Sequence, residues 1–254
     1  MKQIPNLFTL LNLVFGCIAI VCILQTGQAI VYIDPNGFTS LDLPERIAIA
    51  SFFIFAAALV DFLDGFIARL FKASSEMGKQ LDSLADVVSF GVAPGLIIYQ
   101  MLRISFAKET EGLDASVAAL LPAFLIPCAG AWRLAKFNID TTQQYSFKGV
   151  PIPAAGITIA SFPLIVHYQQ FNLQEVLFSK WILYGIILLL SYLMVSNVPL
   201  LSLKFKDMSL KNNMPKYMIA AIAIIAAIVL KWVAIPVVFI AYVIVSLAFK
   251  NKIA

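Results

Sequence analysis

Charged side chains are scarce in this sequence of 254 residues, where Asp, Glu, Lys and Arg together make up only 13%. Hydrophobic residues make up 61%, and the mean hydropathy is +0.91. A soluble domain of this length has too little interior to hide that much apolar surface from water. The composition therefore excludes a soluble globular protein and predicts an integral membrane protein.

Histidine and cysteine are almost absent. His167 is the only histidine, which excludes a zinc site built on histidines and a histidine general base. The three cysteines, Cys17, Cys22 and Cys128, stand in apolar stretches without the spacing of a metal site, so we expect packed thiols. Proton transfer in this protein must therefore fall to carboxylates.

Signal-peptide features are missing around the first apolar run, which lacks a strong basic region and a small-residue cleavage site. We therefore expect this run to be a membrane helix. The sequence also shows no internal repeat, low-complexity segment or soluble domain. Apolar runs long enough to cross about 30 Å of hydrocarbon recur along the whole chain. The expected fold is an all-α polytopic membrane bundle of about eight helices, at 6–26, 45–71, 77–104, 115–138, 151–170, 179–197, 214–230 and 232–249.

We expect one transmembrane domain over residues 1–254, with a catalytic core at about 1–197. Residues 198–254 then form a basic cytoplasmic loop and a C-terminal helical pair. Lys231 and Trp232 are the only polar break within that pair, so one long bent helix is an alternative. The loop at 198–216 mixes leucines with lysines, so it either lies on the cytoplasmic leaflet or is an ordinary basic loop.

Basic residues are distributed unequally between the two ends of the expected helices. If eight helices alternate in direction, 13 of the 18 lysines and arginines fall on one side of the membrane. Basic residues concentrate on the cytoplasmic side of membrane proteins. The distribution therefore predicts that both termini are cytoplasmic. It also favours eight helices over seven, since an odd count would place the termini on opposite sides.

Four aspartates occur within two consecutive apolar helices, close to the short turn that joins them. An aspartate at the centre of a membrane helix costs about 2.5–3.5 kcal/mol, so four unpaired aspartates would cost roughly 10 kcal/mol. Residues three and four positions apart share one face of a helix, and antiparallel neighbours can turn such faces toward each other. The two expected faces consist of Asp61, Asp64, Gly65 and Ala68 on one helix, and Gly78, Asp82, Asp86 and Ser89 on the next.

Carboxylates gathered at one depth suit a hard divalent cation such as Mg²⁺ or Mn²⁺, bound as one or two ions. Gly65 and Ala68 leave space beside the acids, and Arg69 at the membrane edge supplies a planar donor suited to phosphate. Together these features predict a diphosphate site at the headgroup level. Two alternatives are interhelical polar contacts and cation transport, although a transporter needs acids spread through the membrane depth.

The segment from Asp61 to Asp86 resembles the signature of the CDP-alcohol phosphotransferases, D-x2-D-G-x2-A-R-x8-G-x3-D-x3-D, without a departure. Members of that family are integral membrane enzymes that cleave a CDP-linked lipid or alcohol and release CMP. Four flanking segments resemble the branch that uses serine, namely Ile4–Asn12, Asp86–Pro94, Arg133–Asn138 and Lys148–Gly156. The branch usually has arginine where Lys136 stands.

The resemblance implies an enzyme that transfers the phosphatidyl group of CDP-diacylglycerol to the hydroxyl of L-serine, giving phosphatidylserine and CMP. Within the same chemistry, a phosphatidylglycerophosphate or phosphatidylinositol phosphate synthase is the alternative, and a cation transporter is a more distant one. We expect a homodimer from the resemblance alone, and no nucleic-acid partner. The expected location is the bacterial cytoplasmic membrane, with the active site facing the cytoplasm.

The resemblance also assigns roles to residues. Asp61, Asp64, Asp82 and Asp86 become the metal site, in which Asp86 is also the base that takes the proton of the acceptor hydroxyl. The CDP portion is expected to contact Asn6, Thr9, Gly65, Ala68, Arg69 and Gly78. Helix capping explains Asn6 and Thr9 equally well. The serine carboxylate is expected to bind among Arg133, Lys136, Asn138 and Lys148, for which anchoring at the cytoplasmic surface is the alternative.

Overall fold

The computed structural model describes residues 4–24, 31–33, 39–41, 43–71, 75–108, 116–139, 147–201 and 210–249. Helices dominate this part of the chain, which confirms the predicted helical membrane fold. Two shorter apolar helices cover Ile152–His167 and Lys180–Val195. Among the described residues, five helical stretches are long and apolar enough to cross a membrane, namely Pro5–Leu24, Glu45–Leu70, Glu76–Ala107, Val117–Ile139 and Asn213–Ala248.

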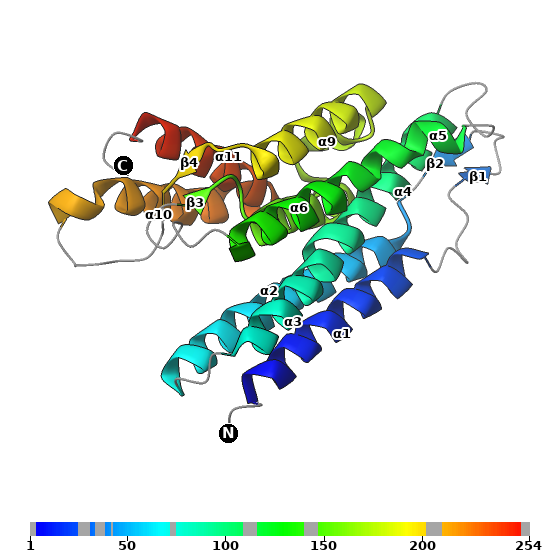
Figure 1. Ribbon diagram of the computed structural model, residues 1–254. Helices are drawn as coiled ribbons and strands as arrows, with labels where there is room; N and C mark the ends of the chain where they lie inside the picture. Colours follow the sequence, from blue (N-terminus) through cyan, green and yellow to red (C-terminus); the bar gives the residue numbers. More distant parts are fainter. Residues whose placement is uncertain are drawn as a thin grey trace.

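The N-terminal half forms a layer in which α1 packs along α2 and α3 (Figure 1). Helix α1 also reaches the π-helix η1 and helix α4, which continue the axis of α3. Between α1 and α2, strands β1 and β2 pair as a short antiparallel hairpin. The bounds are α1 Ile4–Leu24, β1 Val31–Ile33, β2 Thr39–Leu41, α2 Glu45–Leu70, α3 Glu76–Asp86, η1 Val87–Val92 and α4 Ala93–Ala107.

The second half of the core places two helices against this layer. Helix α7 packs on α2, η1 and α4, and α6 packs on α9 and η1. The contacts of α6 and α7 with η1 bring residues distant in sequence close to the aspartates. The bounds are α5 Val117–Leu120, η3 Leu121–Phe124, α6 Leu125–Ile139, α7 Ile152–His167, η4 Gln170–Asn172, α8 Gln174–Leu177 and α9 Lys180–Val195.

The C-terminal helices α10 (Leu210–Leu230) and α11 (Ala234–Ala248) pack against each other as a hairpin (Figure 1). The 3-10 turn η5 (Lys231–Val233) separates them, with Lys231 at a positive φ of 50°. This turn lies at the polar break found in the sequence, so the alternative of one bent helix is wrong. The expected loop at 198–216 is also too long, because α10 begins at Leu210; residues 202–209 lie outside the described part.

A two-stranded ladder joins the segment before α7 to the end of α9, and the sequence did not predict it. Strand β3 (Phe147–Lys148) pairs with β4 (Pro199–Leu200). Gly149 follows β3 at a φ of 76°, and a Cβ atom there would collide with main-chain oxygens at the end of α9. Glycine is therefore required by both the backbone conformation and the close approach.

The third predicted helix is not one continuous α-helix. Immediately after Asp86 the chain forms the π-helix η1 over six residues. A Cβ atom on Gly16 of α1 would collide with Ser89, and one on Gly156 of α7 would collide with the backbone of Phe90. The two glycines therefore let α1 and α7 approach η1 closely. Such π segments are rare and occur often at functional sites.

Candidate active site

The four aspartates lie together where the C-terminal end of α2 faces α3. Carboxylate oxygens of Asp61, Asp64 and Asp82 all lie within 4.8 Å of one another. Asp86 is one turn further along α3, is buried, and lies within electrostatic range of the other three. The prediction that the acidic faces of the two helices meet is therefore confirmed.

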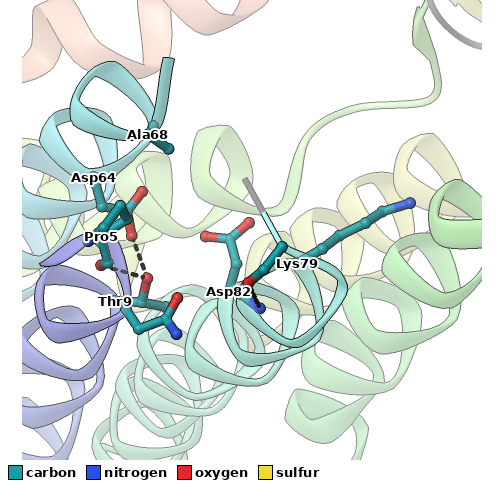
Figure 2. Close-up of a pocket in the computed structure, with 10 residues that line it drawn as sticks. Pro5, Thr9, Asp64, Ala68, Lys79 and Asp82 are labelled. Atoms are coloured by element: carbon teal, nitrogen blue, oxygen red, sulfur yellow. Dashed lines mark hydrogen bonds between the residues drawn. The ribbon is translucent and has the colours of Figure 1, made fainter. Parts of the chain in front are cut away.

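Two hydrogen bonds from α1 hold the buried members of the cluster. The hydroxyl of Thr9 donates to Asp64 Oδ2 at 2.7 Å, as Figure 2 shows, and Asn12 Nδ2 donates to Asp86 Oδ1 at 3.4 Å. Both donors are uncharged, so they orient the carboxylates without neutralising them. Ionised carboxylates repel one another at these distances, so a bound cation would stabilise the cluster. The donor set, three carboxylates whose oxygens lie within 4.8 Å of one another, fits a hard divalent cation.

A cavity of about 230 Å³ opens beside the cluster (Figure 2). Five of the six residues predicted to contact CDP line it, together with two of the aspartates. Arg69 is exposed and does not line the cavity. Its guanidinium nevertheless lies near Gly65, since Nη1 would be 3.8 Å from a Cβ atom built on that glycine. The lining residues are Pro5, Asn6, Thr9, Asp64, Gly65, Ala68, Ser75, Gly78, Lys79 and Asp82.

The cavity depends on how α3 begins. Ser75 caps the helix, since its hydroxyl accepts a hydrogen bond from the amide of Gly78 at 3.0 Å. A Cβ atom on Gly78 would meet the side-chain oxygens of Asn6 and Ser75. The glycine therefore keeps the wall of the cavity open where α1 meets α3. The sequence did not indicate that Ser75 and Lys79 line the cavity, because polar residues are ordinary in a turn between two helices.

The four residues expected to bind serine do not share one location. Arg133 on α6 is buried, at 7% exposure, and lies within electrostatic range of Asp86. Lys136 Nζ instead donates to Asn197 Oδ1 at 2.7 Å, beyond the end of α9. Asn138 Nδ2 donates to Ser83 Oγ at 2.8 Å on α3. Lys148 belongs to β3, and its side chain lies outside the described part.

Asn12 is the contact that sequence reasoning missed. Asn12 is fully buried, and its side-chain amide contacts Asp86. Its main-chain carbonyl oxygen accepts a hydrogen bond from the hydroxyl of Ser89 in η1 at 3.1 Å. A signal was present, because Thr9, Asn12 and Gly16 follow helical spacing on one face of an otherwise apolar helix. That face is the one that packs on the aspartates.

These features define a class of protein, namely a helical membrane protein with a carboxylate cluster that can bind a metal beside a cavity lined by small and polar residues. The family model described as CDP-alcohol phosphatidyltransferase matches residues 2–195. The chain belongs to this family. The resemblance seen in the sequence is thereby confirmed.

Named relatives agree with this membership. The chain is 36% identical over 183 residues to the CDP-diacylglycerol–serine O-phosphatidyltransferase of Helicobacter pylori strain J99, covering 66% of this chain and 71% of the relative. It is 32% identical over 185 residues to the Bacillus subtilis enzyme of the same name, covering 71% and 89%. It is also 35% identical over 141 residues to an archaetidylserine synthase of Methanothermobacter thermautotrophicus, covering 54% and 56%.

Proposed function

We propose that this protein transfers the phosphatidyl group of CDP-diacylglycerol to the hydroxyl of L-serine, giving phosphatidylserine and CMP. The observation that carries the proposal is the aspartate cluster of the family signature beside a cavity with room for a diphosphate-linked group. The relatives named for the serine reaction support serine as the acceptor.

The cluster is proposed to bind one or two Mg²⁺ or Mn²⁺ ions through Asp61, Asp64 and Asp82, with Asp86 at its inner edge. Three carboxylates within 4.8 Å of one another fit this role. When bound there, a divalent cation offsets the negative charge of the diphosphate and stabilises the leaving CMP.

The cavity is proposed to hold the CDP portion. Gly65, Ala68 and Gly78 leave its wall free of bulk, and Asn6 and Thr9 supply polar atoms. Arg69 lies at the edge, where its guanidinium is placed to contact phosphate. The acyl chains then extend into lipid, while cytidine lies toward the polar end of α3.

Asp86 is proposed to be the general base. It takes the proton of the serine hydroxyl while the serine oxygen bonds to the phosphorus attached to diacylglycerol, and the bond from that phosphorus to CMP breaks. Arg133 is the proposed partner of the serine carboxylate, because it is a buried cation near Asp86. Lys136 and Asn138 are proposed to hold α6 against α9 and α3. A contact between Lys148 and the serine carboxylate stays a prediction.

Eight spans, cytoplasmic termini and an active site facing the cytoplasm of a bacterial inner membrane are part of the proposal, as is a homodimer. The distribution of lysine and arginine supports the orientation. Arg69 and Lys79 flank the turn between α2 and α3, so the aspartates lie close to the basic side. Acids gathered near one end of two helices also favour an enzyme over a cation transporter.

The test measures CMP release by the purified protein with CDP-diacylglycerol, Mn²⁺ and one of three acceptors. We expect release with L-serine, and little with glycerol-3-phosphate or inositol phosphate. Release with a phosphorylated acceptor but not with serine would contradict the acceptor and indicate another synthase of the family. No release with any acceptor would contradict the enzyme itself.

A further inference from the structure

Two buried side chains next to Asp86 each leave one polar atom without a hydrogen-bond partner. In the described part of the chain, three buried side-chain atoms lack a partner: Asn12 Oδ1, Arg133 Nε and Ser191 Oγ. Asn12 bonds Asp86 directly, and Arg133 lies within electrostatic range of it. Buried polar atoms are almost always paired, so two exceptions around one carboxylate require an explanation.

The unpaired atom of Asn12 is an acceptor. A carboxylate accepts hydrogen bonds and cannot donate them, so the amide nitrogen of Asn12 faces Asp86 and the amide oxygen is left over. Thr9, one turn earlier on the same face of α1, has no such deficit, since its hydroxyl contacts both Asp64 and the carbonyl of Pro5. Packing alone does not require an amide at a position that is 0% exposed.

The unpaired atom of Arg133 is a donor. Arg133 lies on α6, and η1 packs against both α6 and α1. The two unpaired atoms therefore differ in kind and come from two helices that meet η1 just beyond Asp86. A ligand that satisfied both would carry an anionic acceptor and a cationic donor, with a third group placed at the carboxylate.

We propose that Asn12 Oδ1 binds the ammonium of the acceptor amino acid while Arg133 Nε binds its carboxylate, so that the hydroxyl points at Asp86. This inference rests on the proposed function and deepens it, because it assigns Asn12 a part in acceptor choice. A neutral amide suits this role: it accepts from the ammonium without adding charge, and it leaves one oxygen of Asp86 free for the hydroxyl proton. A zwitterion is thereby selected over an alcohol that lacks either charge.

The experiment uses two competitive inhibitors of serine-dependent CMP release, each lacking one charge. Ethanolamine keeps the hydroxyl and the ammonium, whereas 3-hydroxypropionate keeps the hydroxyl and the carboxylate. Asn12→Ala should raise the serine KM and the ethanolamine Ki at least tenfold, and should leave the 3-hydroxypropionate Ki within twofold. Arg133→Gln should raise the serine KM and the 3-hydroxypropionate Ki at least tenfold, and should leave the ethanolamine Ki within twofold. Turnover falls in Asn12→Ala because Asp86 loses its donor, but that loss affects kcat equally for every acceptor.

Ser89→Ala is the matched control. This variant removes the hydrogen bond from Ser89 to the main-chain carbonyl of Asn12 and leaves the side-chain amide of Asn12 in place. The ratio of the two inhibitor constants should therefore stay at the wild-type value. If Asn12→Ala does not yield folded protein, Asn12→Ser should show the same pattern at smaller amplitude, at least threefold.

Two results overturn the inference. Both inhibitor constants rising together in the Asn12 variant would mean that the amide only orients Asp86, and neither constant moving would mean that it contacts no acceptor. These failures are distinguishable from failure of the proposed function, because the wild-type protein would still release CMP with serine.

Discussion

The aspartate-bearing helix α3–η1–α4 and the C-terminal hairpin α10–α11 are both apolar and helical, yet their surroundings differ. In the most apolar 18-residue window, 56% of the residues are buried for Glu76–Ala107 and 17% for Asn213–Ala248. The first stretch lies within the family match at residues 2–195, and the second lies beyond it. Hydropathy alone therefore does not indicate which helix carries chemistry.

The way in which each region is held also differs. Around Asp86, glycines of α1 and α7 allow close contact, and hydrogen bonds from α1 fix individual side chains. The hairpin packs on α7 and is fastened to β4 through Leu201, whose amide donates to Ser246 Oγ at 3.2 Å and whose carbonyl accepts from the Tyr242 hydroxyl at 3.0 Å. Substitutions should therefore affect catalysis in the first region and stability in the second.

The largest effect is expected for Asp86→Asn. An amide keeps the shape of the side chain but cannot accept the proton, and loss of a general base costs about 10²–10⁴-fold in rate. Binding of CDP-diacylglycerol should persist. The measurement is CMP release beside an equilibrium binding assay, with Glu76→Gln, an exposed acid at the start of the same helix, as the control. Turnover like that of the wild type would remove Asp86 from the mechanism.

Asp64→Asn should act on the metal requirement. The variant loses one charge of a three-carboxylate set, so we expect the Mn²⁺ concentration for half-maximal activity to rise at least tenfold, roughly 1.4 kcal/mol. Asp61→Asn should do the same, and a chelator should abolish activity in the wild type. Thr9→Val, which removes the hydrogen bonds of the Thr9 hydroxyl to Asp64 and to the carbonyl of Pro5 and keeps all the carboxylates, is the milder comparison. An unchanged Mn²⁺ titration contradicts the ligand assignment.

Ala68→Leu tests bulk without a change of charge. The larger side chain would occupy the cavity beside Asp64 in which the CDP portion is proposed to bind. We expect weaker CDP-diacylglycerol binding with unchanged Mn²⁺ dependence. The same exchange at Ala221, an exposed position of the hairpin, should leave both unchanged and so sharpen the contrast between the regions. Normal lipid affinity in Ala68→Leu would place the cytidine elsewhere.

Arg133→Lys keeps the charge and removes the planar donor geometry that matches a carboxylate. The serine KM should rise about tenfold, roughly 1.4 kcal/mol, while the KM for CDP-diacylglycerol stays nearly constant. A parallel rise in both constants would show that Arg133 holds lipid phosphate or the fold. If neither constant moves, the residue only anchors α6, and Lys148 becomes the next candidate.

The smallest effect on catalysis is expected for Ser246→Ala in the hairpin. This change leaves the buried amide of Leu201 without an acceptor, which costs about 1–3 kcal/mol of stability. The midpoint of thermal unfolding in detergent should fall, while kcat/KM stays within twofold. A large loss of turnover without a loss of stability would break the comparison, since it would give the hairpin a part in the reaction.

The sequence predicted the features that follow from local patterns. Helical spacing placed Asp61 and Asp64 on one face and Asp82 and Asp86 on another, and the short turn between the helices implied that these faces meet. Lys231 marked the turn between the last two helices. The sequence did not predict the π-helix after Asp86. Its hydropathy does not distinguish it from an α-helix, because both turns use the same apolar residues.

By itself, the sequence determined that this is a helical membrane protein with a metal-competent aspartate cluster, because helical periodicity and the cost of burying charge act within a few turns of one chain segment. Only the tertiary structure decided which distant residues complete the site. It brought Asn12 and Arg133 to Asp86, whereas Lys136 contacts Asn197 beyond the end of α9 and Asn138 contacts Ser83 on α3. The physical reason is that helix packing and a local π-turn set these directions, and both depend on contacts between segments far apart in the chain.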